Sequence, residues 1–238
     1  MVLKKIKNKI KAFIKGKIGK KNSKKKEAVL LFCAHNDDHI IGAGGTLAKY
    51  AKEGIDVVTV IFSYGESTHP WLKDSEIIKK RVAESRKADD IVGGDKLYYF
   101  GLKEGKFLEE IEKKKIENKI KRFINIVRPI KIFTHSLDDF HPDHKAVYET
   151  IIKIMDEIDY ECDMYSFDIW NPLNIRHRNK PKLVVDISKT FKQKIKAIRE
   201  HESQWMALAT MIPAVYIRGL LNGLDKGVKY AEVFVKLR

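Results

Sequence analysis

The sequence predicts an α/β protein with a Rossmann-like, mostly parallel sheet and helices on both faces. Short apolar runs of strand length alternate four times with longer helical patterns, which is typical of successive βαβ units. Of the 238 residues, 44% are hydrophobic, so a chain of this length can bury one ordinary core. A basic amphipathic helix at the N-terminus is expected in addition to this body.

The first predicted strand, residues 29–34, is a continuous apolar run, as expected for a strand buried on both faces. The other strands of the four repeats are predicted at 56–62, 97–100 and 130–134. Their helices are predicted at 40–53, 74–92, 108–126 and from about 144 to 158. The later part is less regular, with strands at 183–187 and 230–236 and helices at 189–202 and 205–221. The helix at 205–221 is apolar and is expected in the core or an interface, with lipid contact as the alternative.

The formal net charge of +15 is concentrated at one end of the chain. Residues 1–26 hold 12 Lys and no acid, whereas residues 27–238 hold 35 basic and 32 acidic residues. We therefore predict a tail and linker at 1–26 and a nearly neutral folded body at 27–238. Within residues 1–19, apolar side chains recur mostly at steps of three and four between lysines, which favours a helix lying on an anionic membrane surface.

Two other interpretations of the tail stay open, a solvated extension and a binding segment for nucleic acid or a protein. Nucleic acid is disfavoured because the tail has no Arg and only Phe13 as an aromatic residue. The longest stretch without charged residues or His, 203–217, is shorter than the roughly 18 residues that span a bilayer. With only Cys33 and Cys162, the chain predicts a reducing, cytoplasmic setting, with peripheral membrane association through the tail.

The first polar cluster, residues 35–39, follows the first strand and precedes a helix. Its adjacent carboxylates, Asp37 and Asp38, require different roles. One can bind a divalent metal together with His35, while the other stays free to take a proton from a water molecule. A plain helix cap is the alternative for such a cluster.

The second polar cluster, His141-Pro142-Asp143-His144, follows another strand and opens another helix. The helix dipole disfavours a charged imidazole at His144, which suits a neutral metal ligand, and Asp143 or Asp139 can orient a neighbouring ring. By itself this pattern fits a polar helix start. Because ligands bind beyond the carboxyl ends of parallel strands, the two clusters together predict a catalytic metal site.

These motifs resemble those of the PIG-L/LmbE-like N-acetylglucosaminyl deacetylases. The family pattern AHPDDE, followed by GGTLA, corresponds to AHNDDH at 34–39 and GGTLA at 44–48, and its HPDH is intact at 141–144. Weaker matches follow in the family's order at 63–66, 81–88, 185–188, 201–204 and 230–234. The resemblance covers about residues 28–238 and excludes the tail.

The resemblance implies a Zn²⁺-dependent hydrolase that removes acetate from an N-acetylglucosamine-containing small-molecule or lipid-linked substrate. It assigns the metal to His35, Asp38 and His144. It also implies that Asp37 is the general base, that His141 stabilises the oxyanion or acts as an acid, and that Arg81 contacts the substrate. The alternative is a membrane- or nucleic-acid-binding protein with an inactive hydrolase-like body, and a further one is a hydrolase for another acyl group or sugar.

Two positions depart from the family pattern. Asn36 replaces Pro, for which we expect an effect on loop rigidity only. His39 replaces Glu and is expected to be a solvated or packing residue, or else to support the ligands or touch the substrate. Elsewhere, Cys33 is expected in the core rather than as a nucleophile, and NAD binding is disfavoured because the third glycine of the dinucleotide motif falls on Leu47. The loop at 65–71 is expected either to cover a sugar or to have no such role.

Overall fold

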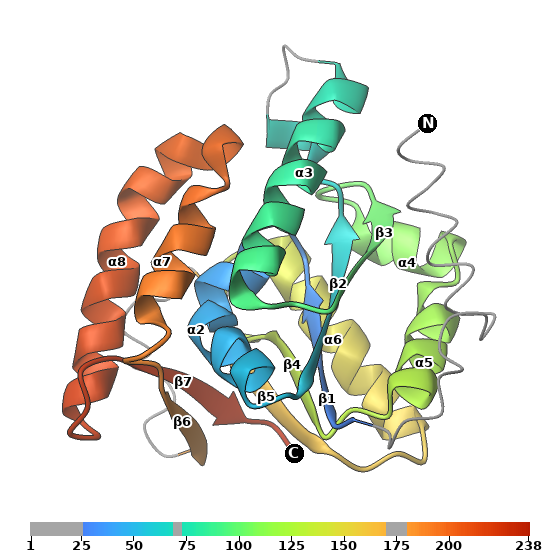
Figure 1. Ribbon diagram of the computed structural model, residues 1–238. Coiled ribbons are helices and arrows are strands. Elements are labelled where there is room, and N and C mark those ends of the chain that lie inside the picture. Colours follow the sequence, from blue (N-terminus) through green and yellow to red (C-terminus); the bar gives the residue numbers. More distant parts are fainter. Residues whose placement is uncertain (1–25, 69–72, 170–179) are drawn as a thin grey trace.

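The computed structural model describes residues 26–68, 73–169 and 180–238. The predicted fold class is confirmed: one seven-stranded, mostly parallel sheet has helices on both faces (Figure 1). The strands are β1 (Ala28–Cys33), β2 (Asp56–Ser63), β3 (Lys96–Leu102), β4 (Lys131–His135), β5 (Asp163–Phe167), β6 (Lys182–Asp186) and β7 (Ala231–Lys236). The helix predicted within residues 1–19, and residues 69–71 of the loop at 65–71, lie outside the described residues.

The strand order is β3-β2-β1-β4-β5-β7-β6, and the first five strands in this order run parallel. Strand β7 is antiparallel to both of its neighbours. The apolar run in β1 reflects burial on two sides, since alternate residues join different hydrophobic cores. Strand β5 is missing from the sequence prediction, because its sequence DMYSF has polar residues among the apolar ones and forms no continuous run.

One face of the sheet is covered by α2 (Asp38–Lys52), α3 (Asp74–Val92), α7 (Phe191–Arg199) and α8 (Trp205–Leu224). The other face is covered by α4 (Phe107–Lys113), α5 (Ile116–Val127) and α6 (Pro142–Glu157). The single helix predicted at 108–126 is wrong, because Lys115 adopts a left-handed conformation with φ 50° and separates α4 from α5. Neither Gly nor Pro marks this break in the sequence.

The centre of the sheet is a topological switch point. Strands β1 and β4 are neighbours, but from β1 the chain continues to β2 and β3 on one side, and from β4 it continues to β5 on the other. The loops leaving β1 and β4 therefore diverge around a crevice at the carboxyl edge, where ligands bind in open α/β sheets. Both polar clusters of the sequence follow these two strands.

A buried ion pair connects the C-terminal strand to α2. Nζ of Lys194 donates to Oε1 of Glu232 at 2.6 Å and to the carbonyl of Ile41 at 2.7 Å. The same carboxylate accepts the backbone N–H groups of Gly45 and Thr46 at 3.0 and 2.7 Å. Burial lowers the pKa of Lys194, and Glu232 opposes this effect. Glu232, which lies in the late sequence match at 230–234, therefore holds α2 and α7 together.

We expect Lys194→Met to lower the free energy of unfolding by about 3–5 kcal/mol, because it leaves the Glu232 carboxylate buried without its cation. Urea denaturation measures the change. Lys192→Met is the matched control, since Lys192 is an exposed neighbour on the same helix. Equal stability of the two variants would show that the pair does not support the fold.

Candidate active site

The loop after β1 carries the first polar cluster and is fixed by hydrogen bonds. Oδ2 of the buried Asp38 accepts the backbone N–H of His35 at 2.7 Å. The side chain of the fully buried Asn36 donates to the carbonyl of Tyr64 at 2.8 Å, and the Asn36 carbonyl accepts the hydroxyl of Ser85 at 2.8 Å. Asn36 therefore ties the loop to the end of β2 and to α3, which supports the expected role in loop rigidity.

The loop between β4 and α6 has its own internal hydrogen bonds. Nδ1 of His141 accepts the N–H of Asp143 at 3.1 Å and caps α6, in which Pro142 occupies the first turn. Oδ1 of Asp139 accepts the N–H of His141 at 3.0 Å. These contacts hold the His141 ring and leave His144 buried in the first turn of the helix.

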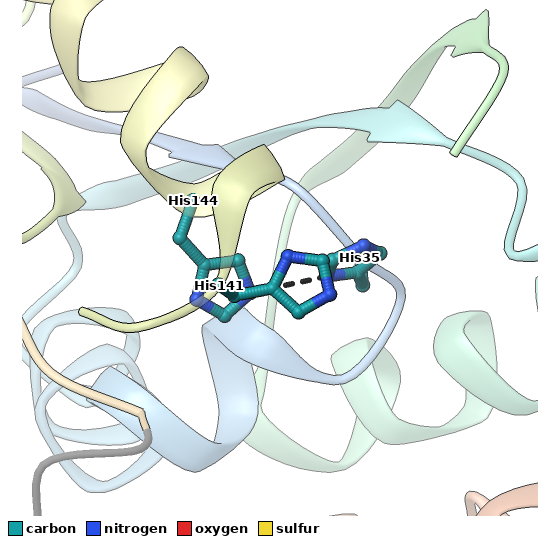
Figure 2. Close-up of side chains that lie close together, drawn as sticks. All are labelled: His35, His141 and His144. Atoms are coloured by element: carbon teal, nitrogen blue, oxygen red, sulfur yellow. Dashed lines mark hydrogen bonds between the residues drawn. The ribbon is translucent and has the colours of Figure 1, made fainter. Parts of the chain in front are cut away.

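The three residues assigned to the metal meet at one point. Nδ1 of His35 lies 3.1 Å from Nε2 of His144 (Figure 2). Oδ2 of Asp38 lies 3.5 Å from Nδ1 of His35, and Oδ1 of Asp38 lies 3.5 Å from Nε2 of His144. In a tetrahedral site with bonds of ~2.0–2.1 Å, ligand atoms are about 3.3 Å apart. The spacing of the three side chains therefore fits a small divalent cation.

Outer carboxylates orient both imidazoles toward this point. Nδ1 of His144 lies 3.0 Å from Oδ2 of Asp139, and Nε2 of His35 lies 3.4 Å from Oδ2 of Asp143. Protons on these two nitrogens leave the lone pairs of the other two nitrogens facing each other beside the Asp38 carboxylate. A single cation at this point can bind both lone pairs and the carboxylate. Two imidazole nitrogens and one carboxylate oxygen form a donor set that zinc accepts.

The electrostatics of the site also favour a positive charge between these side chains. A proton or a metal ion can supply this charge: burial lowers the pKa of His35, but Asp143 and Asp38 outweigh it and raise the pKa to about 10. Metal binding at neutral pH therefore displaces a proton from the His35 ring and frees the lone pair. Burial raises the pKa of Asp38, but His144 and His135 hold it well below its usual range. The ionised Asp38 is therefore available as a ligand.

A cavity of about 450 Å³ opens beside these three side chains, and Asp37, Arg81 and His141 line it. Oδ1 of Asp37 lies 3.8 Å from Nη2 of Arg81. The buried guanidinium of Arg81 also donates from Nη1 to the carbonyl of Gly65 at 3.1 Å and lies 3.6 Å from Oε1 of Glu104. Asp37 thus faces the same cavity as the ligands while its carboxylate pairs with Arg81.

His141 lines the cavity as a hydrogen-bond donor. Because its Nδ1 accepts the Asp143 N–H, the proton of the neutral ring lies on Nε2. Burial and the neighbouring His35 and His144 lower the pKa of His141, which favours this neutral form. Its ring centroid lies 4.7 Å from those of both His35 and His144.

Two residues of the site are absent from the sequence prediction. Nε2 of His135 accepts the N–H of Ala34 at 3.0 Å and lies 3.2 Å from Oδ2 of Asp38, and its ring stacks on His144 at 3.9 Å. Glu104 lies in the loop after β3, next to Arg81. Their positions in the sequence could have suggested them. Glu104 follows β3 and His135 ends β4, and both strands end at the same edge of the sheet.

His39 lies away from the cavity. It is fully buried, and its Nε2 lies 3.8 Å from Oδ1 of Asp89 on α3. Burial lowers the pKa of His39 to about 3, an effect to which His201 adds. The structure agrees with the expectation that His39 is a packing residue and contradicts the expectation that it is solvated. Cys33 is likewise buried, and burial raises the pKa of its thiol.

We expect Asp139→Asn to weaken metal binding by about 10–100-fold, because the variant loses the anionic partner that orients His144. Competition with a chromophoric chelator measures the affinity for Zn²⁺. Asp138→Asn, the same change at the neighbouring residue, is the control. Unchanged affinity in the Asp139 variant would mean that His144 needs no outer carboxylate.

Comparisons with known proteins identify sequence relatives. A family model described as GlcNAc-PI de-N-acetylase matches residues 30–155, just over half of the chain, and the match includes both polar clusters. A diacetylchitobiose deacetylase from Thermococcus kodakarensis is 28% identical over 224 residues, which cover 86% of this chain and 80% of the relative.

Two solved structures share the fold. The N,N'-diacetylchitobiose deacetylase from Pyrococcus horikoshii, complexed with its inhibitor MPG, has a TM-score of 0.73 at 21% identity and covers 98% of this chain and 92% of its own. GalB, the 4-carboxy-2-hydroxymuconate hydratase from Pseudomonas putida KT2440, has a TM-score of 0.74 at 20% identity, with coverage of 89% and 96%. Because a hydratase shares this architecture, the fold alone does not select the reaction.

Proposed function

The chain belongs to the GlcNAc-PI de-N-acetylase (PIG-L) family, and from this premise we propose that it is a metal-dependent hydrolase that removes acetate from an N-acetylglucosamine-containing glycoconjugate. One observation carries the proposal: His35, Asp38 and His144 converge at ligand spacing, while a further carboxylate, Asp37, faces the same cavity. The deacetylase from Thermococcus kodakarensis, which acts on diacetylchitobiose by its name, supports the choice of substrate.

We propose Zn²⁺ as the metal, held by His35, Asp38 and His144. When bound, the ion supplies Lewis acidity, which activates water and polarises the amide carbonyl. Asp139 and Asp143 keep the two imidazoles in the tautomers that ligation requires. Other divalent ions accept the same donors, so metal analysis of the purified protein tests this assignment.

The remaining side chains supply proton transfer and orientation. Asp37 takes the proton of the attacking water, since its carboxylate faces the cavity and is not engaged as a ligand. His141 directs its Nε2 hydrogen to the carbonyl oxygen as negative charge develops there, or passes a proton to the leaving amine. Arg81 holds Asp37 and lines the cavity, and we propose that it also contacts the sugar.

The test is acetate release from a panel that includes N-acetylglucosamine, diacetylchitobiose and N-acetylglucosaminyl phosphatidylinositol, with metal-loaded protein. Release of acetate that disappears in Asp37→Asn would establish the reaction and rank the substrates. If metal is bound but no member of the panel is hydrolysed, the proposed reaction is wrong. The alternative, a membrane- or nucleic-acid-binding protein whose hydrolase-like body is inactive, would then describe the chain better.

A further inference from the structure

Helix α8 presents an apolar surface to solvent. Six of the nine exposed large hydrophobic side chains among the described residues belong to this helix. They are Trp205, Met206, Ile217, Leu220, Leu221 and Leu224, with exposed fractions between 42% and 74%. The remaining exposed positions of α8 are Ala209, Thr210 and Pro213, so only one of them is polar. We call these six large side chains the α8 face.

The single charged residue of α8 does not interrupt this face, because Arg218 points inward. Its Nη1 and Nη2 donate to the carbonyls of Asp168 and Ile169 at 2.6 and 3.1 Å. Leu208, Met211 and Val215, on the opposite side of the helix, join the hydrophobic core. Residues 202–224 are long and apolar enough to cross a membrane, but these inward contacts identify α8 as a surface helix of the body.

The helix next to α8 carries a row of exposed positive charges. Helix α7 packs next to α8 (Figure 1), and its sequence FKQKIKAIR contains no acidic residue. Its exposed cations are Lys192, Lys196 and Arg199, at steps of four and three, which lie on one side of a helix. We call these three residues the α7 cations.

We propose that the α8 face docks onto an anionic phospholipid bilayer, with the α7 cations contacting the lipid headgroups. An apolar helix surface next to lysines is the composition of helices that lie in the membrane interface, where the apolar side chains enter the headgroup boundary and the cations stay in the aqueous phase. Trp205, at one end of the face, is of the residue type enriched at that boundary.

A second copy of the chain is a poorer partner for this surface. A two-fold dimer would bring the same patch of both protomers together, and neither α7 nor α8 contains an acidic residue that could pair with the α7 cations. An anionic bilayer complements both the apolar and the cationic parts of the surface.

Helix α8 also borders the catalytic cavity, from the side of the helix opposite to the α8 face. Ala207 and Met211 belong to α8 and line the cavity together with Asp37 and His141. The docking proposal therefore does not depend on the proposed reaction.

Flotation of the full chain with vesicles tests the docking. We expect binding to vesicles of phosphatidylcholine and phosphatidylglycerol in equal amounts, and a loss of about ten- to a hundredfold in affinity for the double variant Leu220→Gln/Leu224→Gln. Leu108→Gln/Leu137→Gln, which changes two exposed leucines outside α8, is the matched control and should bind as the parent does. Lys192→Glu/Lys196→Glu should lose binding to the anionic vesicles.

Each measurement is repeated in a chain whose 12 lysines within residues 1–26 are all replaced by Gln, so that electrostatic binding through the tail does not hide the effect. Equal flotation of the parent and of Leu220→Gln/Leu224→Gln in both backgrounds would overturn the proposal. So would a dimer that dissociates in this variant without any binding to vesicles. Unchanged hydrolysis of a soluble substrate by the variant separates a failure of docking from a failure of the proposed reaction.

Discussion

Asp37→Asn is expected to lower the rate of acetate release by about 10²–10⁴-fold, the range typical of a lost general base. The amide of Asn cannot take a proton from water, while its size and shape are nearly those of Asp. Metal content should stay at the parent level, because no ligand is removed. Steady-state kinetics with the best substrate of the panel, together with metal analysis of the same samples, provide both readouts.

The kinetic profile separates this role from substrate binding. Loss of a group that acts in the transition state lowers kcat, whereas loss of uniform binding raises KM alone. Arg81→Lys is the informative comparison: it keeps a cation beside Asp37 but lacks the planar fork of the guanidinium. An Asp37→Asn variant that keeps more than a tenth of the parent kcat would contradict the assignment of the base.

The second large effect is expected for His144→Ala, which should weaken Zn²⁺ binding by about 10²–10³-fold and abolish turnover. In structural zinc sites ~10–16 kcal/mol of binding free energy is shared by four ligands, or about 3–4 kcal/mol for each. A loss of that size corresponds to two or three orders of magnitude in affinity. Equilibrium dialysis against a metal buffer measures the change.

His141→Ala is the matched control for this prediction. One ring nitrogen from each of His35, His141 and His144 lies within 4.8 Å of the other two, so the geometry offers His141 as a rival ligand. If His141 acts on the substrate, as we propose, its removal should spare metal affinity and lower kcat. Equal losses of metal in the two histidine variants would indicate that His141, and not Asp38, is the third metal ligand.

The sequence predicted an element correctly where the burial of that element in the fold is visible in its own residues. The alternation of apolar runs and helical patterns predicted four of the five parallel strands, since strands buried on both faces have apolar runs. Both polar clusters could be located because each follows such a run. The register between β1 and β4, which pairs Leu31 with Phe133, then brings two loops about 100 residues apart to the same edge.

The features that the sequence did not predict depend on contacts rather than on periodicity. Strand β5 gains its hydrogen bonds from β4 and β7, not from a strand-like pattern of its own. The left-handed Lys115 lies in a run of lysines with no breaking residue. His135 and Glu104 are single polar residues whose partners come from other loops, so only the three-dimensional arrangement shows that they surround Asp38 and Arg81.

The ion pair between Lys194 and Glu232 has a consequence for the order in which the protein matures. Helix α2, which begins with the proposed ligand Asp38, receives polar contacts at Ile41, Gly45 and Thr46 from Lys194 and Glu232, near the other end of the chain. A nascent polypeptide still attached to the ribosome lacks these partners until its last strand has emerged. These contacts therefore form only after the C-terminal strand has been translated, and a premature stop codon shortly before residue 232 would remove this support of the candidate active site while leaving both polar clusters encoded.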